Sequence, residues 1–215
     1  MLYEYIDGET VGEKELTEDQ VCQLSEILTE LHLYGEELPF ETAAMKEDFD
    51  VPFLQQLRDI VAQEVHHIPN ELRQVISPHT EHIKSLVDTV EELSELLKSS
   101  PLRMVLCHTD LHNWNLMQSE QQLILIDWEG LKIAPVEADM MSLVDKPYYK
   151  KLLSIYKKTH QNFVINPDAL KFYQGRRKLE DIWEFIEQVL FDKQDEQEKA
   201  VTLNYLTEEL KSISH

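Results

Sequence analysis

Glycine, cysteine and basic residues are scarce in this chain of 215 residues. It contains 5 glycines, 2 cysteines and 20 lysines and arginines, against 41 aspartates and glutamates, so its formal net charge is −21. Such a charge excludes nucleic acid as a partner, because phosphate backbones need lysine and arginine to neutralise them. No apolar run is long enough to span a membrane, and the N-terminus lacks a basic stretch followed by a hydrophobic one. We therefore expect a soluble, cytoplasmic protein with no membrane partner.

The two cysteines, Cys22 and Cys107, lie far apart and have no metal-ligand spacing. Both fall on apolar faces of their segments, so we expect buried thiols in a reducing compartment. Apolar residues make up 42% of the chain, which at this length allows a substantial core and one or two subdomains. The scarcity of glycine favours helix over irregular structure.

Hydrophobic periodicity predicts a mostly helical chain with a small β region in its middle. A short strand is expected at 1–6, and Thr17-Glu18-Asp19-Gln20 has the form of a capping box, which predicts a helix from there to about Gly35. Two apolar strands, 103–107 and 122–126, flank a polar loop, so we expect a hairpin that carries the polar groups. Further helices are expected at 51–67, 79–98, 148–160, 168–174, 177–192 and 195–212.

The loop between these two strands carries residues suited to one kind of chemistry. It reads His108-x-Asp110-x-x-x-x-Asn115, and Asp127 ends the apolar run 123–126. Phosphoryl transfer from ATP needs a carboxylate that accepts the proton of the acceptor hydroxyl, and oxygen ligands that hold magnesium against the phosphates. Asp110 suits the role of catalytic base, with His108 beside it as a hydrogen-bonding support of the loop. Asn115 and Asp127 suit the role of metal ligands, because magnesium prefers oxygen.

A second interpretation of the same loop is a metal-dependent hydrolase. His108-x-Asp110-x-His112 also has residue types that bind zinc or iron. Such a site needs further ligands from other parts of the chain. The available histidines are His66, His67, His79 and His82. They lie in predicted helices at surface-like positions, which makes the hydrolase the less favoured interpretation.

The motifs of the loop also resemble those of a known family. The segment from His108 to Asn115, the following Ile126-Asp127-Trp128-Glu129 and the segment from Pro135 to Asp139 are similar to motifs of aminoglycoside phosphotransferases. That family shares a protein-kinase-like fold with choline kinases. The resemblance implies an α+β, predominantly helical C-terminal lobe of this fold, with a small β hairpin carrying the catalytic loop. It also implies ATP and Mg²⁺ as cofactors, and Asp139 as a structural support of the loop.

The first eight residues resemble the hinge between the two lobes of these kinases. The resemblance divides the chain into this hinge-like strand, residues 1–8, and a helical lobe for catalysis and substrate binding, residues 9–215. It implies that the backbone around Glu4 and Ile6 pairs with the adenine of ATP. Trp114 departs from the family pattern, which usually has a small residue before the asparagine.

The family's N-terminal lobe supplies a glycine-containing phosphate loop and a lysine that holds the phosphates. Neither precedes the hinge-like segment, and the pattern G-x-x-x-x-G-K does not occur. The chain thus resembles the C-terminal lobe alone. Because phosphoryl transfer depends on positioning and charge stabilisation, we expect very weak or no kinase activity from the chain as it stands. We also expect exposed apolar surface near residues 1–8, through which the chain would self-associate or bind a partner.

The implied acceptor is a small hydroxylated molecule, and a cationic one suits the acidic balance of the chain. The predicted helix 177–192 has one face that suits an ammonium group, by charge or over the indole ring. This face carries Glu180, Trp183, Glu184 and Glu187. The same pattern is typical of an amphipathic helix with Trp183 in the core. The leading hypothesis is an ATP- and magnesium-dependent O-phosphotransferase, and the alternative is a non-catalytic lobe that binds a ligand or a partner.

Overall fold

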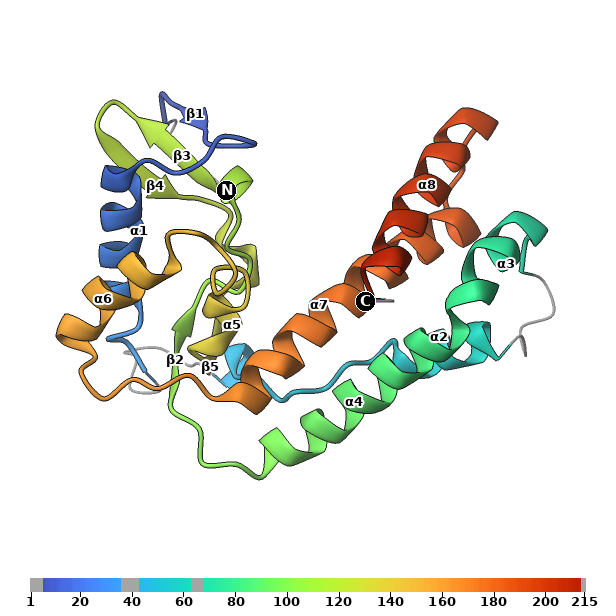
Figure 1. Ribbon diagram of the computed structural model, residues 1–215, viewed down its shortest axis with the longest axis horizontal. Coiled ribbons are helices and arrows are strands. Elements are labelled where there is room, and N and C mark those ends of the chain that lie inside the picture. The colour runs from blue at the N-terminus through green and yellow to red at the C-terminus, as the bar shows by residue number, and fades with distance from the viewer. Residues whose placement is uncertain (1–5, 36–42, 63–67, 214–215) are drawn as a thin grey trace. The chain divides into compact units, whose positions relative to one another are not determined.

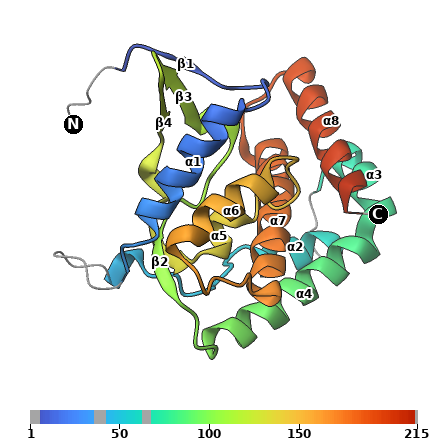
Figure 2. The same cartoon turned by 60° about the vertical axis from the view of Figure 1, so that its left-hand side comes forward.

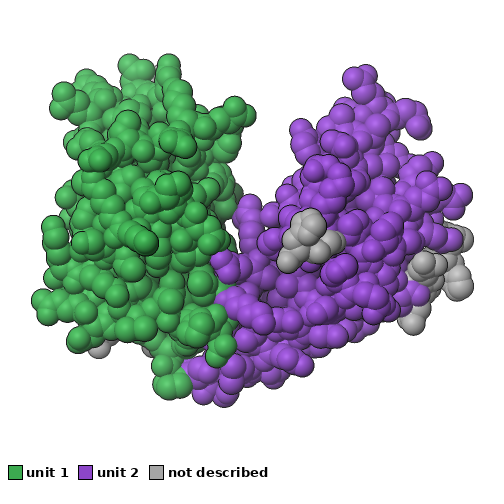
Figure 3. Space-filling view, viewed as in Figure 1, with its two compact units in different colours: residues 1–48, 101–170 green, residues 49–100, 171–215 purple. Residues whose placement is uncertain are grey.

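The computed structural model describes residues 6–35, 43–62 and 68–213. The chain forms two compact units, each made of two segments that are distant in sequence (Figure 3). Unit 1 comprises residues 1–48 and 101–170, and unit 2 comprises residues 49–100 and 171–215. The strand predicted at 1–6 lies almost entirely outside the described residues.

Unit 1 is built on helix α1 (Glu18–Leu31), which packs against α6 (Tyr149–Thr159) (Figure 2). The predicted capping box is present at the start of α1. The Gln20 amide N–H donates to Thr17 Oγ1 at 3.3 Å, and the Thr17 N–H donates to Gln20 Oε1 at 2.9 Å. These bonds satisfy two of the N–H groups that a helix start leaves without a partner, which explains why the helix begins here.

Two small antiparallel sheets complete unit 1 (Figure 1). Strands β1 (Glu9–Thr10), β3 (Leu116–Ser119) and β4 (Gln122–Leu125) form one sheet in the order β1-β3-β4. Strands β2 (Met104–Cys107) and β5 (Lys132–Pro135) form the other. The small antiparallel sheets and the helical majority confirm the predicted fold class.

The pairing of the strands differs from the expected hairpin. The segments predicted at 103–107 and 122–126 are both strands, but they lie in different sheets. β4 pairs with β3 across a two-residue turn, in which Glu120 has a φ of 49°. A strand that can close such a tight turn with its neighbour in sequence pairs locally, which leaves β2 to pair with β5.

Helix α1 also protects the edge of the three-stranded sheet. The Leu123 N–H of the edge strand β4 donates to Gln23 Oε1 at 2.7 Å, and Gln23 Nε2 donates to the Gln121 carbonyl at 3.0 Å. These bonds satisfy one backbone group of the edge strand and one of the turn before it, which would otherwise need water or another chain. The short helical elements of unit 1 are η1 (Ala43–Met45), η3 (Asn113–Asn115), η4 (Trp128–Gly130) and α5 (Glu137–Met140).

All the secondary-structure elements in the described part of unit 2 are helices. Its elements are α2 (Leu54–Val61), α3 (Asn70–Ile76), η2 (Ser77–His79), α4 (Thr80–Lys98), most of α7 (Pro167–Phe191) and α8 (Glu196–Ser212). α2 packs on α4, and α3 packs on α8. The helix predicted at 51–67 begins later, at Leu54, and helix α3 was not predicted. In the part of the chain that the structure describes, no helix is both long and apolar enough to cross a membrane.

The buried-thiol expectation holds for one of the two cysteines. Cys107 on β2 is fully buried, whereas Cys22 on α1 is only half-buried. Both are free thiols. The half-buried position of Cys22 follows from its place beside, and not within, the buried face formed by Val21, Leu24 and Leu28.

Helix α7 is continuous, although two helices with a break near residue 175 were predicted. Gly175 lies inside α7, where glycine ordinarily weakens a helix. A Cβ at this position would lie 2.8 Å from Val90 Cγ2 and 3.3 Å from Leu86 Cδ1, both on α4. The glycine therefore permits close packing of α7 on α4, and this tertiary contact overrides its low helix propensity.

The acidic and aromatic face of α7 is largely engaged within unit 2. Trp183 is half-buried and stacks on Phe53 with ring centroids 5.9 Å apart, which fits the amphipathic interpretation. Glu180 pairs with Arg176 at 2.7 Å, and Asp181 pairs with Arg177 at 3.1 Å. Burial is the largest influence on Asp181 and raises the pKa of its carboxyl group to about 6, against the opposing effect of Arg177.

We expect the substitution Gly175→Ala to destabilise unit 2. A Gly→Ala change in a helix ordinarily stabilises by about 0.5–1 kcal/mol, but overpacking costs about 1–3 kcal/mol, so the net loss should be about 1 kcal/mol. Thermal unfolding measures this as a lowered Tm. In the Val90→Ala background the added methyl group has room, and the same change should then be neutral or stabilising. Equal effects in both backgrounds would contradict the packing argument.

We expect Asp181→Asn to stabilise the protein at pH 7 by about 1 kcal/mol, which is less than the full pKa shift implies because the side chain is 31% exposed. The folded state disfavours the charged carboxylate, so its cost is present above a pH of about 6 and disappears as the pH falls below the usual value of 3.8. The gain in Tm should therefore shrink between pH 7 and pH 4. Asp192→Asn, at an exposed position, makes the same charge change and is the control. A gain that is independent of pH, or equal in the control, would contradict this prediction.

Candidate functional site

The loop that carries the predicted base leaves β2 at His108, which is fully buried. Its Nε2–H donates to the Ile126 carbonyl at 2.8 Å, and its Nδ1 accepts the Asp110 N–H at 3.4 Å. The edge of the ring also meets the Trp128 ring, with centroids 4.9 Å apart. Both imidazole nitrogens therefore hold the loop in place, and neither is left to bind a metal as the hydrolase interpretation requires.

The next residue, Thr109, has a φ of 71°, which is a strained conformation for a β-branched side chain. Its N–H donates to Asp139 Oδ1 at 2.6 Å, and its hydroxyl donates to the Gly130 carbonyl at 2.8 Å. The other oxygen of Asp139 accepts the His108 N–H at 3.1 Å. Strain of this kind costs about 1–3 kcal/mol and persists only where surrounding bonds enforce it. Asp139 supplies two such bonds directly before Asp110.

Asp110 lies at the surface of the loop, with its side chain 36% exposed. Two nitrogen atoms approach its Oδ2, namely Asn115 Nδ2 at 3.0 Å and His112 Nε2 at 3.3 Å. Asn115 Nδ2 also donates to the Asp110 backbone carbonyl at 2.9 Å. The carboxylate is thus held in one orientation while it remains accessible to a solute, which is the arrangement that a general base needs.

Asn115 and Asp127 are brought together by the β3–β4 hairpin. The strand register places Asn115 opposite Ile126, whose N–H donates to the Asn115 carbonyl at 2.9 Å, and Asp127 follows directly. Asp127 is exposed and has a φ of 64° and a ψ of 67°, a left-handed conformation that aspartate tolerates better than most residues. Because the side-chain nitrogen of Asn115 is used toward Asp110, its amide oxygen is the atom suited to a metal.

Of the two residues proposed for adenine, Glu4 lies outside the described residues. Ile6 is half-buried and precedes β1. The segment after it runs along β3, since the Ser119 hydroxyl donates to the Asp7 carbonyl at 2.6 Å. A Cβ at Gly8 would lie 2.6 Å from the Gln118 carbonyl oxygen, so glycine is required for this close approach.

Trp114, which departs from the family pattern, is accommodated by a second glycine. Its side chain is 59% exposed, and a Cβ at Gly12 would lie 3.3 Å from the indole ring. Gly12 has a φ of 59°, and its N–H donates to the Asn113 carbonyl at 3.1 Å. The indole thus packs over the turn that follows β1.

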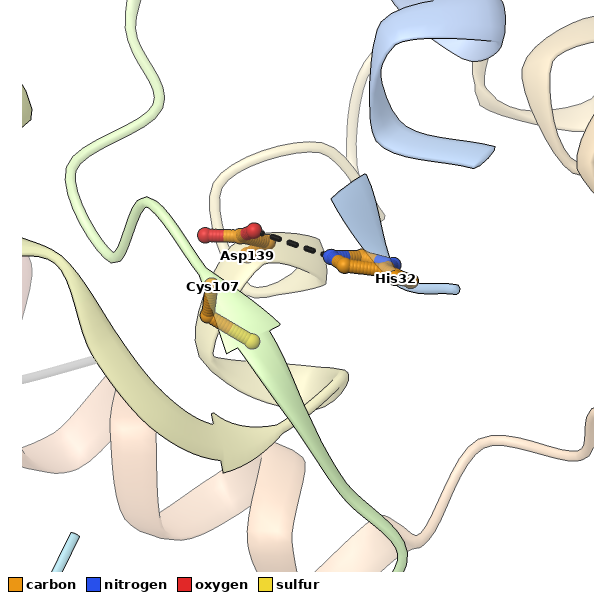
Figure 4. A group of neighbouring side chains, drawn as sticks. All are labelled: His32, Cys107 and Asp139. Atoms are coloured by element: carbon orange, nitrogen blue, oxygen red, sulfur yellow. Dashed lines mark hydrogen bonds and ion pairs between the residues drawn. The ribbon is translucent and has the colours of Figure 1, made fainter. Parts of the chain in front are cut away.

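His32, which was not predicted as a site residue, lies at the end of α1 and is fully buried. Figure 4 shows His32 and Asp139 directed toward each other, with Cys107 beside them on β2. His32 Nε2 lies 2.9 Å from Asp139 Oδ2, and His32 Nδ1 lies 3.0 Å from the Tyr156 hydroxyl. The signal in the sequence is its spacing, because His32 follows Leu28 by four residues and so extends the buried face of the helix.

His32, Cys107 and Asp139 form the one group of three potential metal ligands that lie close together among the described residues. Asp139 already accepts three N–H groups, and both nitrogens of His32 have hydrogen-bond partners. Burial, followed by the charges of Asp139 and Glu137, raises the pKa of the Cys107 thiol well above its ordinary value. A thiol that keeps its proton is a poor metal ligand, and the other two side chains already have hydrogen-bond partners. The three residues therefore form a hydrogen-bonded core and not a metal site.

Comparison with known proteins identifies the family and the fold. The model of the phosphotransferase enzyme family (APH) matches residues 1–173. A solved structure of spectinomycin phosphotransferase APH(9)-Ia, with ADP and spectinomycin bound, has a TM-score of 0.74 and 22% identity, over 98% of this chain and 69% of that one. No curated protein sequence matches the chain.

Two choline kinases have the same fold. Choline kinase LicA from Streptococcus pneumoniae has a TM-score of 0.58 and 18% identity, over 97% of this chain and 69% of that one. Choline kinase from Cryptosporidium parvum Iowa II has a TM-score of 0.55 and 19% identity, over 98% of this chain and 70% of that one. At these identities the likeness concerns the fold, which is kinase-like. Because the family model matches most of its length, the chain belongs to the phosphotransferase enzyme family.

Proposed function

We propose that the chain carries the catalytic base and metal ligands of an ATP- and magnesium-dependent O-phosphotransferase for a small hydroxylated acceptor. The observation that carries this proposal is the constellation at the end of β2. An accessible Asp110 is held by Asn115, and the strained residue before it is held by a buried carboxylate. The protein accelerates phosphoryl transfer mainly by positioning the reactants and stabilising charge. The bonds around Asp110 would position the base toward the acceptor.

Asp110 takes the role of the base that accepts the proton of the acceptor hydroxyl. Asn115 and His112 hold one oxygen of its carboxylate, so the approach direction of the acceptor is restricted. His108 takes no part in proton transfer in this proposal, because its two nitrogens bond to Ile126 and Asp110 backbone atoms. It supports the loop together with Asp139.

Asn115 and Asp127 take the role of magnesium ligands. The donor set fits the ion, since an amide oxygen and a carboxylate are the hard ligands that Mg²⁺ prefers. Their adjacent positions on the hairpin favour binding of the same ion by both residues. The ion, when bound, neutralises charge on the phosphates. In this proposal the backbone near Glu4 and Ile6 pairs with the adenine of ATP. Of these two residues, Glu4 lies outside the described part of the chain.

Support for the nucleotide and the acceptor comes from the similar proteins. Spectinomycin phosphotransferase has been solved with ADP and with AMP, and the other similar structures include choline kinases. A small cationic acceptor is consistent with the net charge of −21. A non-catalytic lobe that only binds a ligand would show the same contacts within the chain. A measurement of turnover therefore distinguishes the phosphotransferase from the non-catalytic lobe.

We expect calorimetric titration of Mg-ATP to distinguish the roles of the two carboxylates. Asp127→Ala should weaken binding roughly tenfold or more, about 1.4 kcal/mol, because a metal ligand is lost. Asp110→Asn should bind Mg-ATP like the parent chain. Whatever phosphoryl transfer the parent chain shows to an acceptor such as choline or spectinomycin should fall by roughly 10²–10⁴-fold in this variant. Exposed Asp145→Asn is the control. Binding that is equal in the parent and Asp127→Ala chains would contradict the metal assignment, and binding without turnover in the parent would favour the non-catalytic lobe.

We expect Asp139→Asn to destabilise unit 1 by about 2–4 kcal/mol. The amide has nearly the same shape, but it has one acceptor oxygen and adds a donor that faces a backbone N–H. The carboxylate is fully buried and accepts three N–H groups, so at least one of them loses its partner. Denaturant unfolding measures the loss. A change below about 1 kcal/mol would show that these bonds matter little for stability.

A further inference from the structure

We propose that a cavity at the start of β2 is a ligand site of its own, which binds a small carboxylate with an apolar body. All the residues that line this cavity belong to unit 1, and its volume is about 590 Å³. Pockets for small molecules typically have volumes of roughly 300–1,000 Å³. The proposal does not depend on the phosphotransferase function, because the cavity and the catalytic loop lie at different ends of β2.

The strand register places the cavity. In the antiparallel pair β2–β5, Met104 lies opposite Pro135 at one end, and the loop that carries Asp110 follows Cys107 at the other. Pro135 lines the cavity, together with residues 159–164 at the end of α6 and after it (Figure 1). A strand of four residues is about 13 Å long. A ligand in the cavity therefore does not occupy the proposed active site.

The charge in the cavity comes from Arg103, which directly precedes β2. Its Nη2 group donates to the His32 carbonyl at 3.0 Å and approaches His160 Nδ1 at 3.3 Å. His32 and His160 are both buried, so these two bonds fix the orientation of the guanidinium group. The other nitrogens, Nε and Nη1, have no partner among the residues that the structure describes. They remain available to a ligand.

The imidazole of His160 orients the arginine as a neutral acceptor. Its Nε2–H donates to the Thr29 carbonyl at 3.1 Å, which leaves a lone pair on Nδ1 for Arg103. Burial is the largest influence on this ring and lowers the pKa of His160, and the charge of Arg103 lowers it further. The positive charge of the pair therefore lies on the guanidinium group.

Arg103 differs from the other arginines that face acidic side chains. Arg58, Arg176 and Arg177 each pair with a carboxylate at 3.1 Å or less. Arg103 forms no ion pair within the described ranges, although acidic residues outnumber basic ones by 41 to 20 in this chain. A guanidinium group is well suited to bind a carboxylate. The fixed and unpaired guanidinium of Arg103 thus favours an anion that comes from outside the chain.

Glu137 is the one acidic residue among the described residues that line the cavity. It is buried, and its Oε1 accepts the Asn166 N–H at 2.6 Å. Burial raises the pKa of its carboxyl group, against the opposing effect of the Asn166 N–H. This carboxyl group holds the chain after α6 in place and is not paired with Arg103, so it does not neutralise the guanidinium.

The apolar part of the ligand is indicated by exposed side chains in the same cavity. Val164 is 80% exposed, which is the largest exposed fraction of any large hydrophobic side chain that the structure describes, and Leu33 is 61% exposed. An apolar body would cover these side chains while the carboxylate binds Arg103. Inorganic phosphate would leave them exposed to water. The combination therefore favours an aliphatic or aromatic carboxylate.

The experiment titrates octanoate into the full chain by calorimetry and compares it with 1-octanol, which has the same chain length and no charge. Octanoate should bind with a Kd on the order of 1 mM or tighter, and 1-octanol should bind roughly tenfold more weakly or less. Equal binding of the two compounds would show that the charge is not recognised and would overturn the proposal. Absence of octanoate binding would overturn it as well.

Variants at the exposed Val164 test the charge without disturbing the core. Val164→Glu should weaken octanoate binding roughly tenfold, because the added carboxylate repels the ligand or takes its place at Arg103. Val164→Lys loses the same apolar contact but should bind octanoate at least as well as Val164→Glu does, by roughly tenfold or more. Val201→Glu makes the same change at an exposed valine of α8 and is the control. Equal weakening in Val164→Glu and Val201→Glu overturns the proposal.

Arg103→Gln tests the arginine directly. It should weaken octanoate binding roughly tenfold or more and leave the weaker binding of 1-octanol unchanged, because only a charge-assisted bond is lost. Unchanged octanoate binding overturns the proposal. If this variant does not fold, the variants at Val164 decide, since that side chain lies at the surface.

Amide chemical shifts of the ¹⁵N-labelled chain locate the bound octanoate. They should change at residues 102–103 and 159–164 and stay constant at residues 108–115. Changes confined to the catalytic loop or to α8 overturn the proposal. None of these measurements needs turnover, so a chain without kinase activity would contradict the proposed function and leave this test intact.

Discussion

The site depends on one buried carboxylate. Asp139 has no exposed surface, and burying a charge costs several kcal/mol unless donors surround it. Its donors are the His32 imidazole and the backbone N–H groups of His108 and Thr109. Because two of the three belong to consecutive residues of the catalytic loop, the same bonds that stabilise the charge determine the path of the chain into Asp110.

The side chains of the proposed site all lie at the ends of very short strands. The proposed base Asp110 follows β2, Asn115 precedes β3, and Asp127 follows β4. Strands of four residues are weak alone, so the loop relies on bonds that cross between them, such as the Ile126 N–H to the Asn115 carbonyl and the His108 imidazole to the Ile126 carbonyl. Among the residues that the structure describes, four non-glycine residues have a positive φ, and two of them, Thr109 and Asp127, flank this region. The strained backbone of Thr109 thus lies directly before the proposed base.

Local patterns in the sequence predicted the helices well, and they predicted pairing less well. The capping box at Thr17 and the periodic apolar positions of α1 and α4 depend on neighbours within one or two turns, and these elements were correct. Strand periodicity shows that β2 and β4 exist, but it carries no information on which partner each one finds. The break expected near Gly175 was wrong, because packing of α7 on α4 compensates for the cost of a glycine in a helix.

By itself, the sequence determined which residue types the loop carries and so which chemistry we propose for it. The order and spacing of His108, Asp110, Asn115 and Asp127 predicted a base and oxygen ligands in one loop region, although not how the strands beside them pair. Only the tertiary structure decided that His32 meets Asp139 across 107 positions. That contact requires α1 to pack on α6 and beside β2 before the imidazole reaches the carboxylate. Such a contact depends on distance in space, for which a single sequence has no periodic signal.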